Sequence, residues 1–352
     1  MLPGTTRPCY EQPQPAYCSN SIFSQVDTVN HSDAALLMLD RDVVGELLAP
    51  SDVMSAVREA FELHSRREGR VFPVIREQLE SGGVFGVKAG IVPGKVLLGF
   101  KAAGFWAKNR ETGGEPHQAT VVLLDPHTGR PQCVMDGNAI TTIRTGAAGA
   151  LGLESLARRD SEVLTIFGTG VQATSQLSFA LQVLPKLVSV RYLTRDGQPD
   201  VSFEAAFESR CEIFAAEDAN RAVSESDVII TATPGSGPLF DISAVKPGTH
   251  LNCVGADTRG KRELPDGLLA SAKVFVDDFK QASQLGELQW CPSLSSTELG
   301  DVLSGANRYS RHPDDVTVFD MTGLALQDLT VARQLYEKAL QQAKGKAIRW
   351  PW

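Results

Sequence analysis

The pattern of apolar and polar positions is most informative between residues 163 and 193. A short apolar run over 163–167 leads into a glycine-containing turn, a helix-compatible segment follows over 174–184, and a second apolar run covers 187–193. Short apolar runs bounded by turn residues are typical of buried strands, and the segment between these two runs is long enough for a helix. The pattern therefore predicts a strand, a turn, a helix and a second strand, which together form a βαβ unit.

The turn of this unit has the glycine spacing of a dinucleotide-binding motif. Its residues are Gly168, Thr169, Gly170, Val171, Gln172 and Ala173. Gly168 permits the tight turn, Gly170 lets the backbone approach a pyrophosphate, and Ala173 is small enough for close packing of helix and strand. The helix N-terminus adds free N–H groups and the positive end of a dipole. A turn that only joins strand to helix is the alternative, but the flanking elements favour cofactor binding by these residues.

The end of the second strand bears on the choice of cofactor. NAD sites usually carry Asp or Glu there, where the carboxylate bonds the ribose 2′-hydroxyl. This chain has Thr194 followed by Arg195, and a guanidinium binds a 2′-phosphate. NADP(H) is therefore favoured over NAD(H), although Asp196 would serve NAD(H) if its side chain turned inward.

Shorter apolar runs continue through the C-terminal half at 228–232, 250–254 and 274–276, and helical stretches alternate with them. This alternation predicts an α/β fold of the Rossmann type, with a doubly wound parallel sheet. Thr231 and Ala232, in the first of these runs, are included among the expected cofactor contacts.

The N-terminal half has the pattern of a mostly antiparallel α+β unit. Strands are predicted over 83–90 and 96–102. A hairpin is predicted to join 119–124 to 131–135 through a turn in which Gly129 takes a positive φ.

Three helices are predicted around these strands. Ser51 is expected as the N-cap of the first, and a second, rich in Ala and Gly, is expected to begin at Thr141. A last helix over 325–344 has apolar residues at helical spacing, and we expect it to pack back on the N-terminal half.

These patterns divide the chain into three parts. Residues 1–33 contain four prolines and little periodicity, which predicts a flexible extension. Residues 34–150 and 320–352 are assigned to the smaller α+β domain, and residues 151–319 to the dinucleotide-binding domain.

Composition and charge exclude several classes of protein. A net charge of −8 over 352 residues argues against a general binder of nucleic acid or of anionic membranes, and no apolar run is long enough to span a bilayer. The chain start lacks the pattern of a signal peptide, so a cytoplasmic protein is expected. The six cysteines and six histidines show neither a Cys-x-x-Cys pair nor metal-ligand spacing, so we expect reduced thiols and no metal site.

Basic residues within apolar patterns of the N-terminal half are candidates for substrate binding. They are Arg76, Lys88, Lys101 and Arg144. A buried cation is unfavourable unless it meets an anion, and a substrate carboxylate is such an anion. The alternative places these side chains on the solvated face of a half-buried sheet. It remains open for Lys88, whereas the resemblance described next favours a functional role for Lys101 and Arg144.

An ordered series of short motifs resembles the ornithine cyclodeaminase/mu-crystallin family. The motifs are Phe100-Lys101, His117-Gln118, Leu124-Asp-Pro-His-Thr-Gly129, Thr142-Ile-Arg-Thr145, Phe167-Gly-Thr-Gly170, Val254-Gly-Ala-Asp-Thr-Arg-Gly260 and Phe319-Asp-Met-Thr-Gly323. The resemblance extends from about residue 36 to the C-terminus. It implies a homodimer whose first domain supplies the dimer sheet and the substrate site, a Rossmann domain, and an active site in the cleft between the domains.

The resemblance also implies roles for single residues. Arg76, Lys101 and Arg144 match the cations that hold the α-carboxylate of the substrate, and Asp257 matches the catalytic carboxylate. An imine nitrogen must gain a proton as hydride reaches C2, and a carboxyl group can relay this proton or stabilise the iminium. Lys101 is also counted as catalytic, because the clamp positions C2. Thr145 matches a residue that contacts the cofactor phosphates. A purely structural turn residue is the alternative for Asp257.

Two positions depart from the pattern of ornithine-specific members. Lys88 lies near the place where those enzymes carry a carboxylate for the distal amine, and Ala119 replaces a hydroxyl residue. A lysine there would repel an ammonium and attract a carboxylate. The motifs are more similar to the imine-reductase branch of the family.

The predicted activity is therefore NAD(P)H-dependent reduction of a small 2-imino acid to an L-amino acid, or the reverse dehydrogenation. A substrate with a distal carboxylate, such as iminosuccinate, is favoured. Two alternatives remain: cyclodeamination of ornithine to proline and ammonia, and a mu-crystallin-like protein that binds NADPH and a ligand without significant turnover.

Overall fold

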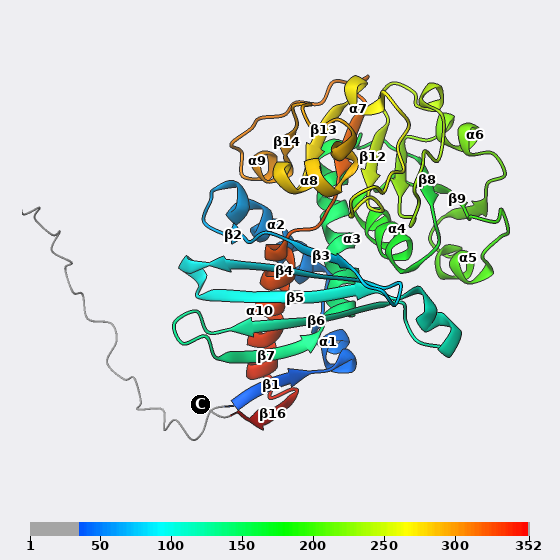
Figure 1. Ribbon diagram of the computed structural model, residues 1–352. Coiled ribbons are helices and arrows are strands. Elements are labelled where there is room, and N and C mark those ends of the chain that lie inside the picture. The colour runs from blue at the N-terminus through cyan, green and yellow to red at the C-terminus, as the bar shows by residue number, and fades with distance from the viewer. Residues whose placement is uncertain (1–34, 351–352) are drawn as a thin grey trace, which may run out of the picture.

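The computed structural model describes residues 35–350 and has two β-sheets, each with helices of its own (Figure 1). The extension predicted over 1–33 lies outside the described residues. Across the described residues, none of the helices combines the length and the apolar character needed to cross a bilayer.

The first sheet is built from the N-terminal part of the chain and the last strand. Its order is β16–β1–β7–β6–β5–β4–β2, β3 also pairs with β4, and these pairings are antiparallel except that of β1 with β7. The strands are β1 (Ala35–Leu39), β2 (Arg70–Val71), β3 (Ile75–Gln78), β4 (Val84–Val92), β5 (Leu97–Phe105), β6 (His117–Leu124), β7 (Pro131–Asp136) and β16 (Lys346–Arg349). The predicted hairpin of β6 and β7 is confirmed, with Gly129 at a φ of 73°.

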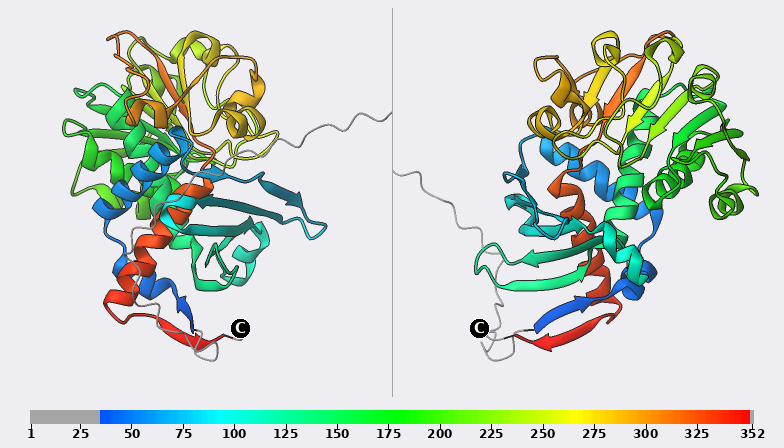
Figure 2. Two further views of the ribbon diagram at one scale, coloured as in Figure 1. Left: turned by 90° about the vertical axis from the view of Figure 1, so that its left-hand side faces the viewer. Right: turned by 45° about the vertical axis from the view of Figure 1, so that its right-hand side comes forward.

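Helices cover one face of this sheet (Figure 2). The helical elements of this part are α1 (Arg41–Leu47), α2 (Pro50–Ser65), η2 (Pro93–Lys95), η3 (Ala107–Thr112), α3 (Gly137–Leu156) and α10 (Ala325–Gln341). Helix α10 packs on β4, β5 and β6, α3 packs on β6, and α2 packs on both helices. Phe61, Leu326 and Leu329 are fully buried in this core. The predicted return of the last helix to the N-terminal half is confirmed.

The second sheet is parallel and has the predicted doubly wound arrangement. Its order is β10–β9–β8–β11–β12–β15–β13–β14. The strands are β8 (Val163–Phe167), β9 (Ser189–Leu193), β10 (Glu212–Ala215), β11 (Val228–Thr231), β12 (His250–Cys253), β13 (Lys273–Val276), β14 (Thr297–Glu298) and β15 (Thr317–Asp320). The helices are α4 (Val171–Val183), α5 (Val201–Phe207), α6 (Ala219–Ser224), η4 (Ile242–Ala244), α7 (Leu268–Ser271), α8 (Phe279–Leu285), η5 (Glu287–Trp290) and α9 (Leu299–Leu303).

The strand order of this sheet reverses between β8 and β11. The chain runs outward from β8 through β9 and β10, and then returns to β11 on the other side of β8. Ligands of open α/β sheets bind at such a switch point, beyond the carboxyl ends of the strands. The glycine turn after β8 and residue Ala232 after β11 both lie at that edge.

The helix starts differ from the predictions, because capping sets them. The first long helix has Ala49 as its N-cap and Pro50 at its first position, so the assignment of Ser51 as N-cap is wrong. Proline is common at the first position of a helix, because a backbone N–H at that position would have no partner within the helix. Helix α3 begins at Gly137, before Thr141, because the Asp136 side chain accepts a hydrogen bond from the Ala139 N–H.

The helix of the βαβ unit and the last helix also differ at one end. Helix α4 begins at Val171 rather than at residue 174, with Gly170 as its N-cap. Helix α10 ends at Gln341 rather than at residue 344, and Ala343 takes a φ of 51° where the chain turns into β16. The apolar spacing located these helices without defining their ends.

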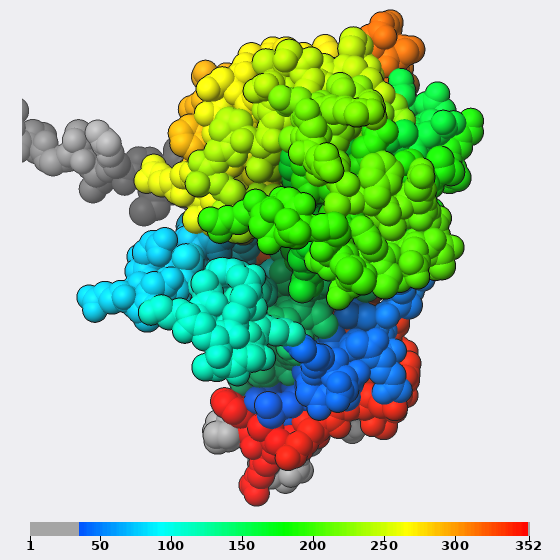
Figure 3. Space-filling model, turned by 90° about the vertical axis from the view of Figure 1, so that its right-hand side faces the viewer, coloured from blue at the N-terminus to red at the C-terminus, as the bar shows by residue number. Residues whose placement is uncertain are grey.

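Helix α3 connects the two parts of the molecule. It packs on β6 of the first sheet and on α4 and β12 of the second part. The surface is hollowed where the two parts meet (Figure 3). Of the residues predicted to bind substrate, three approach this junction from the first sheet and Arg144 from α3, while the glycine turn approaches it from the second sheet.

Candidate active site

The glycine turn at the end of β8 leaves open space in front of helix α4. Gly168 has a φ of 96°, and a Cβ there would lie 2.8 Å from the Ala232 carbonyl oxygen, so the position requires glycine. A Cβ at Gly170 would meet no atom within 4 Å. Val171 is exposed beside this space, whereas Ala173 is fully buried against the sheet. Open space next to free helical N–H groups suits a diphosphate.

Three more residues assigned to the cofactor are Thr169 in this turn, Gln172 at the start of α4 and Thr145 on α3. The Thr169 hydroxyl hydrogen-bonds the Asp200 carboxylate and lowers the pKa of that carboxyl. Gln172 and Thr145 line one cavity together. The Thr145 hydroxyl donates to the Thr141 carbonyl oxygen at 2.6 Å, which ties it to its own helix.

The residues after β9 form a small turn of their own, apart from the cavities. The Thr194 hydroxyl donates to the Gln198 carbonyl oxygen at 2.8 Å, and the Asp196 carboxylate accepts from the Gln198 N–H at 3.2 Å. Asp196 is exposed and does not turn inward. Arg195 is exposed beside it.

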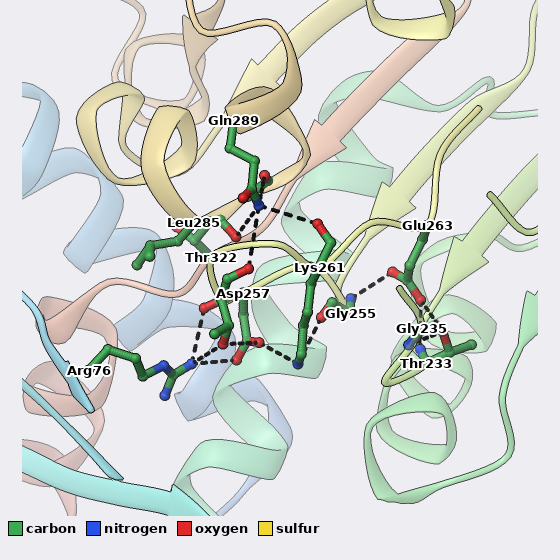
Figure 4. Close-up of polar contacts among 12 residues, drawn as sticks. Arg76, Thr233, Gly235, Gly255, Asp257, Lys261, Glu263, Leu285, Gln289 and Thr322 are labelled. Carbon is green, nitrogen blue, oxygen red and sulfur yellow. Dashed lines mark hydrogen bonds and ion pairs between the residues drawn. The ribbon is translucent and has the colours of Figure 1, made fainter. Parts of the chain in front are cut away.

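Glu263 joins the loops that follow β11 and β12 (Figure 4). Its carboxylate accepts hydrogen bonds from the Thr233 N–H at 2.8 Å, from the Thr233 hydroxyl at 2.7 Å and from the Gly255 N–H at 2.9 Å. Burial raises the pKa of Glu263. Thr231, which is buried, and Ala232, which is half-buried, directly precede Thr233. The carboxylate thus holds both loops at the cofactor edge of the sheet.

Lys101 and Arg144 share one buried carboxylate. The Lys101 ammonium lies 2.8 Å from Asp328 Oδ1, and Arg144 Nε lies 3.0 Å from the same oxygen. Only 4% of the Lys101 side chain and 1% of the Asp328 side chain are exposed. Burial lowers the pKa of Lys101 to about 7. Burial also opposes ionisation of Asp328, but Lys101 and Arg144 outweigh it and lower the pKa of Asp328. Both candidate cations are therefore buried, and the anion that they meet here is Asp328, a carboxylate of the chain itself.

Lys88 points inward, which answers the question that the sequence left open. It lies directly opposite Lys101 in the β4–β5 pair, so both side chains are on the helix-covered face. Its ammonium donates to the carbonyl oxygens of Thr322 at 2.6 Å and Gly323 at 2.8 Å. Burial lowers the pKa of Lys88 to about 8. The alternative in which Lys88 lies on the solvated face is wrong.

Asp257 lies between two cations (Figure 4). Arg76 Nη2 donates to Asp257 Oδ2 and to the Asp257 carbonyl oxygen, each at 3.0 Å. The Lys261 ammonium donates to the other carboxylate oxygen, Asp257 Oδ1, at 2.7 Å. Burial opposes ionisation of Asp257, but Lys261 and Arg76 outweigh it and hold the pKa of this carboxyl well below its usual range. Asp257 is therefore a carboxylate rather than a carboxylic acid in this arrangement.

Two adjoining cavities lie at the junction of the two parts. The first has a volume of about 70 Å³ and is lined by all four candidate cations and Asp257. The second, of about 150 Å³, extends to Gln172 at the start of α4. The residues that line both are His117, Thr141, Arg144, Asp257 and Thr322. A space for a small anionic molecule therefore opens onto a space beside the dinucleotide-binding turn.

Four residues of the site were not among the site residues predicted from the sequence. Asp328 is a carboxylate on the buried face of α10, among Leu326 and Leu329, and this break in the apolar pattern was the available signal. Lys261 and Glu263 lie in an irregular loop, where no periodicity indicates which way a side chain points. His117 belongs to one of the ordered motifs, where it had no role assigned, and it lines both cavities.

Comparison with known proteins places this geometry in a family. The iminosuccinate reductase of Paracoccus denitrificans is 33% identical over 325 residues, which cover 89% of this chain and 99% of that protein. The structure of an archaeal alanine dehydrogenase dimer with bound NAD has a TM-score of 0.84 and 31% identity, covering 90% of this chain and all of that one. The Δ1-pyrroline-2-carboxylate reductase of Thermococcus litoralis, in complex with NADH and L-proline, has a TM-score of 0.83 and 27% identity, covering 89% of this chain and all of that one.

The model of the ornithine cyclodeaminase/mu-crystallin family matches residues 35–343. That range includes the second sheet, all strands of the first sheet except β16, the glycine turn and the residues around the two cavities. The ordered motifs, the fold and the relatives agree, and the chain belongs to the ornithine cyclodeaminase/mu-crystallin family.

Proposed function

We propose that this protein is an oxidoreductase that reduces a small 2-imino acid to an L-amino acid with a reduced nicotinamide cofactor, or catalyses the reverse dehydrogenation. The observation that carries this proposal is the cation-lined cavity with Asp257 at the point where it meets the space beside α4. The names of the relatives, an iminosuccinate reductase and an alanine dehydrogenase, support the same class of reaction.

The cations of the cavity bind and orient the carboxylate of the substrate. Lys101 and Arg144 are held by Asp328, and they line the cavity together with Arg76. Charge-assisted hydrogen bonds from two or three directions fix a carboxylate in one orientation, and this places C2 of the substrate reproducibly.

Asp257 acts on the nitrogen of the substrate. A bound nicotinamide cofactor supplies the hydride that C2 receives. Because Arg76 and Lys261 keep Asp257 ionised, its charge stabilises the positive charge of a protonated imine. Of the two roles considered for this carboxyl group, relay of a proton and stabilisation of the iminium, the ionised state favours the second.

We propose that the preferred substrate carries a second carboxylate, as iminosuccinate does. Four basic side chains line the cavity, whereas Asp257 is the acidic residue beside them and Asp328 pairs with two of them from behind, so basic groups outnumber carboxylates. A dianionic molecule offsets this excess, whereas the second ammonium of ornithine would add to it. Lys88 is thus an argument against cyclodeamination of a diamine.

We propose NADP(H) as the preferred cofactor, with NAD(H) as the alternative. The open space at Gly170 fits the diphosphate of either one. Arg195 supports a 2′-phosphate, because it is exposed directly after Thr194, which takes the place of the acidic residue of an NAD site, and Asp196 is bonded to its own turn. The solved relatives carry NAD or NADH, which makes a direct comparison of the two cofactors necessary.

We propose a homodimer formed through the first sheet. Ala89, Phe100, Val122 and Val134 lie directly opposite one another across four neighbouring strands, on the face away from α10. An apolar row of this kind on an open sheet face is typical of an interface. A second copy of the chain would cover it, and light scattering after gel filtration should give twice the mass of 37.9 kDa. Val122→Asp should release monomers.

The activity is tested with a panel of 2-oxo acids and ammonium, with NADPH and NADH consumption followed in parallel. Oxaloacetate plus ammonium should be consumed faster than pyruvate plus ammonium, and omission of ammonium should abolish both rates. Chiral analysis should find the L-amino acid. Absence of turnover across the panel, or efficient formation of proline from ornithine, would contradict the proposal.

Lys88→Ala tests the substrate class. The variant should lose the preference for oxaloacetate over pyruvate while keeping its pyruvate rate, because the ammonium that pairs with the second carboxylate is gone. Lys95→Ala, an exposed lysine just after β4, is the matched control and should keep the preference. A preference that Lys88→Ala leaves untouched would reject this model of the pocket.

A further inference from the structure

Lys261 holds the same carboxylate as Arg76, but from another side. Its ammonium donates to Asp257 Oδ1 at 2.7 Å and to the Gly255 carbonyl oxygen at 3.2 Å (Figure 4). Arg76 holds the other oxygen, Oδ2, at 3.0 Å, and also donates to the Thr258 hydroxyl at 2.9 Å. The two oxygens of Asp257 are therefore divided between two cations that come from different parts of the molecule.

The two cations differ in their access to the substrate. Arg76 lies on β3 at the edge of the first sheet and lines the first cavity, so it faces an incoming carboxylate. Lys261 is four residues beyond Asp257 on the same loop and is not among the residues that line either cavity. A substrate carboxylate can therefore compete for Arg76 while Lys261 stays in place.

We propose that Lys261 is a positioning residue that keeps Asp257 ionised and oriented when the substrate draws Arg76 away, so that the enzyme reduces the protonated form of the imine. This inference rests on the proposed function. Asp257 is the group that touches the substrate, and Lys261 acts through it.

The electrons and protons balance without a further reactant. The C4–H bond of the reduced cofactor breaks as hydride, a new C–H bond forms at C2, and the electron pair of the C=N bond becomes the lone pair of the amine. The nitrogen keeps the protons that it brought, so Asp257 transfers none during this step. The product amine then takes one proton from water, which yields the ammonium form of the amino acid.

The other basic groups around Asp257 are bonded elsewhere. The ammonium of Lys88 donates to two carbonyl oxygens, and its charge lowers the pKa of Asp257 less than Lys261 and Arg76 do. Arg144, which lines both cavities with Asp257, is bonded to Asp328 and Gln327. Burial lowers the pKa of His117, which favours the neutral ring. Asp277, which lines the second cavity, accepts hydrogen bonds from Thr322 and Gly323 and offers no positive charge. Within residues 35–350, Arg76 and Lys261 are the cations bonded to the Asp257 carboxylate.

The test is the pH dependence of the reductive reaction in wild type, Lys261→Met and Lys261→Arg, each as the full chain with saturating cofactor. Lys261→Met should move the acid-side inflection of kcat upward by about 1–3 pH units, the usual effect of removing a neighbouring opposite charge. The profile of kcat/KM should move less, because it reports the free enzyme, in which Arg76 still pairs with Asp257. Lys261→Arg should restore both profiles, and Lys186→Met, an exposed lysine of the same part, should match wild type.

A second measurement does not depend on turnover. Carbon NMR of the aspartate carboxyl groups, with the Asp257 signal identified by its loss in Asp257→Asn, should show a raised pKa for Asp257 in Lys261→Met. Unchanged pH profiles together with an unchanged NMR titration, accompanied only by a lower Tm, would overturn the proposal. Inactivity of wild type toward every imino acid would instead contradict the proposed function, and the NMR titration would still decide the role of Lys261.

Discussion

The two halves of the site, which we propose bind the cofactor and the substrate, offer different chemical groups. Around Gly168 and Gly170 the chain offers backbone N–H groups, open space and an exposed Arg195. Around the first cavity it offers buried side-chain charges, among them Lys101, which is 4% exposed, and Asp328, which is fully buried. In the proposed function, one half would bind its ligand through a turn that is continuous in sequence, and the other through side chains from β3, β4, β5, α3 and α10.

This difference has consequences for what each half tolerates. A backbone site loses little stability when a nearby side chain changes, because the groups that bind are part of the helix end. A buried charge cluster depends on every member, because removal of one partner leaves the others desolvated and unpaired. We therefore expect substitutions in the substrate half to affect both chemistry and stability, and those in the cofactor half to affect binding alone.

Asp257→Asn should produce the largest effect on activity. The amide keeps the shape but lacks the charge that stabilises the substrate nitrogen, so kcat should fall by about 10²–10⁴-fold, the range for groups of this type. Cofactor binding, measured by fluorescence titration, should be preserved, because the carboxylate belongs to the other half of the site. Near-wild-type turnover in a folded variant would remove Asp257 from the mechanism.

Asp328→Asn should have the largest effect on stability. It leaves Lys101 and Arg144 buried without their carboxylate, and breaking a buried ion pair in this way costs about 3–5 kcal/mol. Urea denaturation measures the loss in the free energy of unfolding. Asp266→Asn, which removes an exposed partner of Arg262, is the control and should change little. Equal losses in the two variants would mean that the buried cluster contributes no more than a surface pair.

The pH dependence of substrate binding should report Lys101. The pKa of its ammonium is lowered by burial to about 7, so the clamp loses a positive charge as the pH rises through that value. The reductive kcat/KM should then fall by up to about tenfold per pH unit above the pKa. Lys101→Arg should flatten this alkaline limb, since a guanidinium stays protonated. If wild type and Lys101→Arg lose kcat/KM equally at alkaline pH, the loss would belong to the titration of another group.

Arg195→Ala should have the smallest effect, confined to one cofactor. Loss of a charge-assisted contact to the 2′-phosphate should weaken NADPH binding by roughly 1–3 kcal/mol and leave NADH binding unchanged. Arg210→Ala, an exposed arginine of the same part, serves as the control. Calorimetric titration measures the affinity of each protein for NADPH and for NADH. Wild type that binds NADH at least as tightly as NADPH would reverse the cofactor assignment.

The local elements were predictable to the extent that periodicity and turn chemistry define them. The β8–α4–β9 unit follows from two apolar runs around a glycine turn, and the β6–β7 hairpin follows from a turn with glycine at its positive-φ position. Helix ends were less predictable: Pro50, Asp136 and Gly170 set three starts through capping, and α3 begins four residues before the start that apolar spacing suggested.

The substrate half was predictable only through its resemblance to a family. Arg76, Lys101 and Arg144 were candidates as basic residues within apolar patterns, but the resemblance supplied their roles and identified Asp257, and the structure gathers all four around one cavity. For Lys88 the strand pattern allowed either face, and the pairing of β4 with β5 decided it by placing this side chain opposite Lys101.

The sequence by itself determined which segments form strands and helices, and where the glycine turn leaves the start of α4 open, because those properties depend on neighbours along the chain. The tertiary structure decided which charges meet. Asp328 neutralises Lys101 and Arg144 across more than 180 residues of sequence, and Lys261 and Arg76 divide the oxygens of Asp257 between them. The ionisation of a buried group depends on the charges and the solvent around it, and these are defined only when distant segments have folded together.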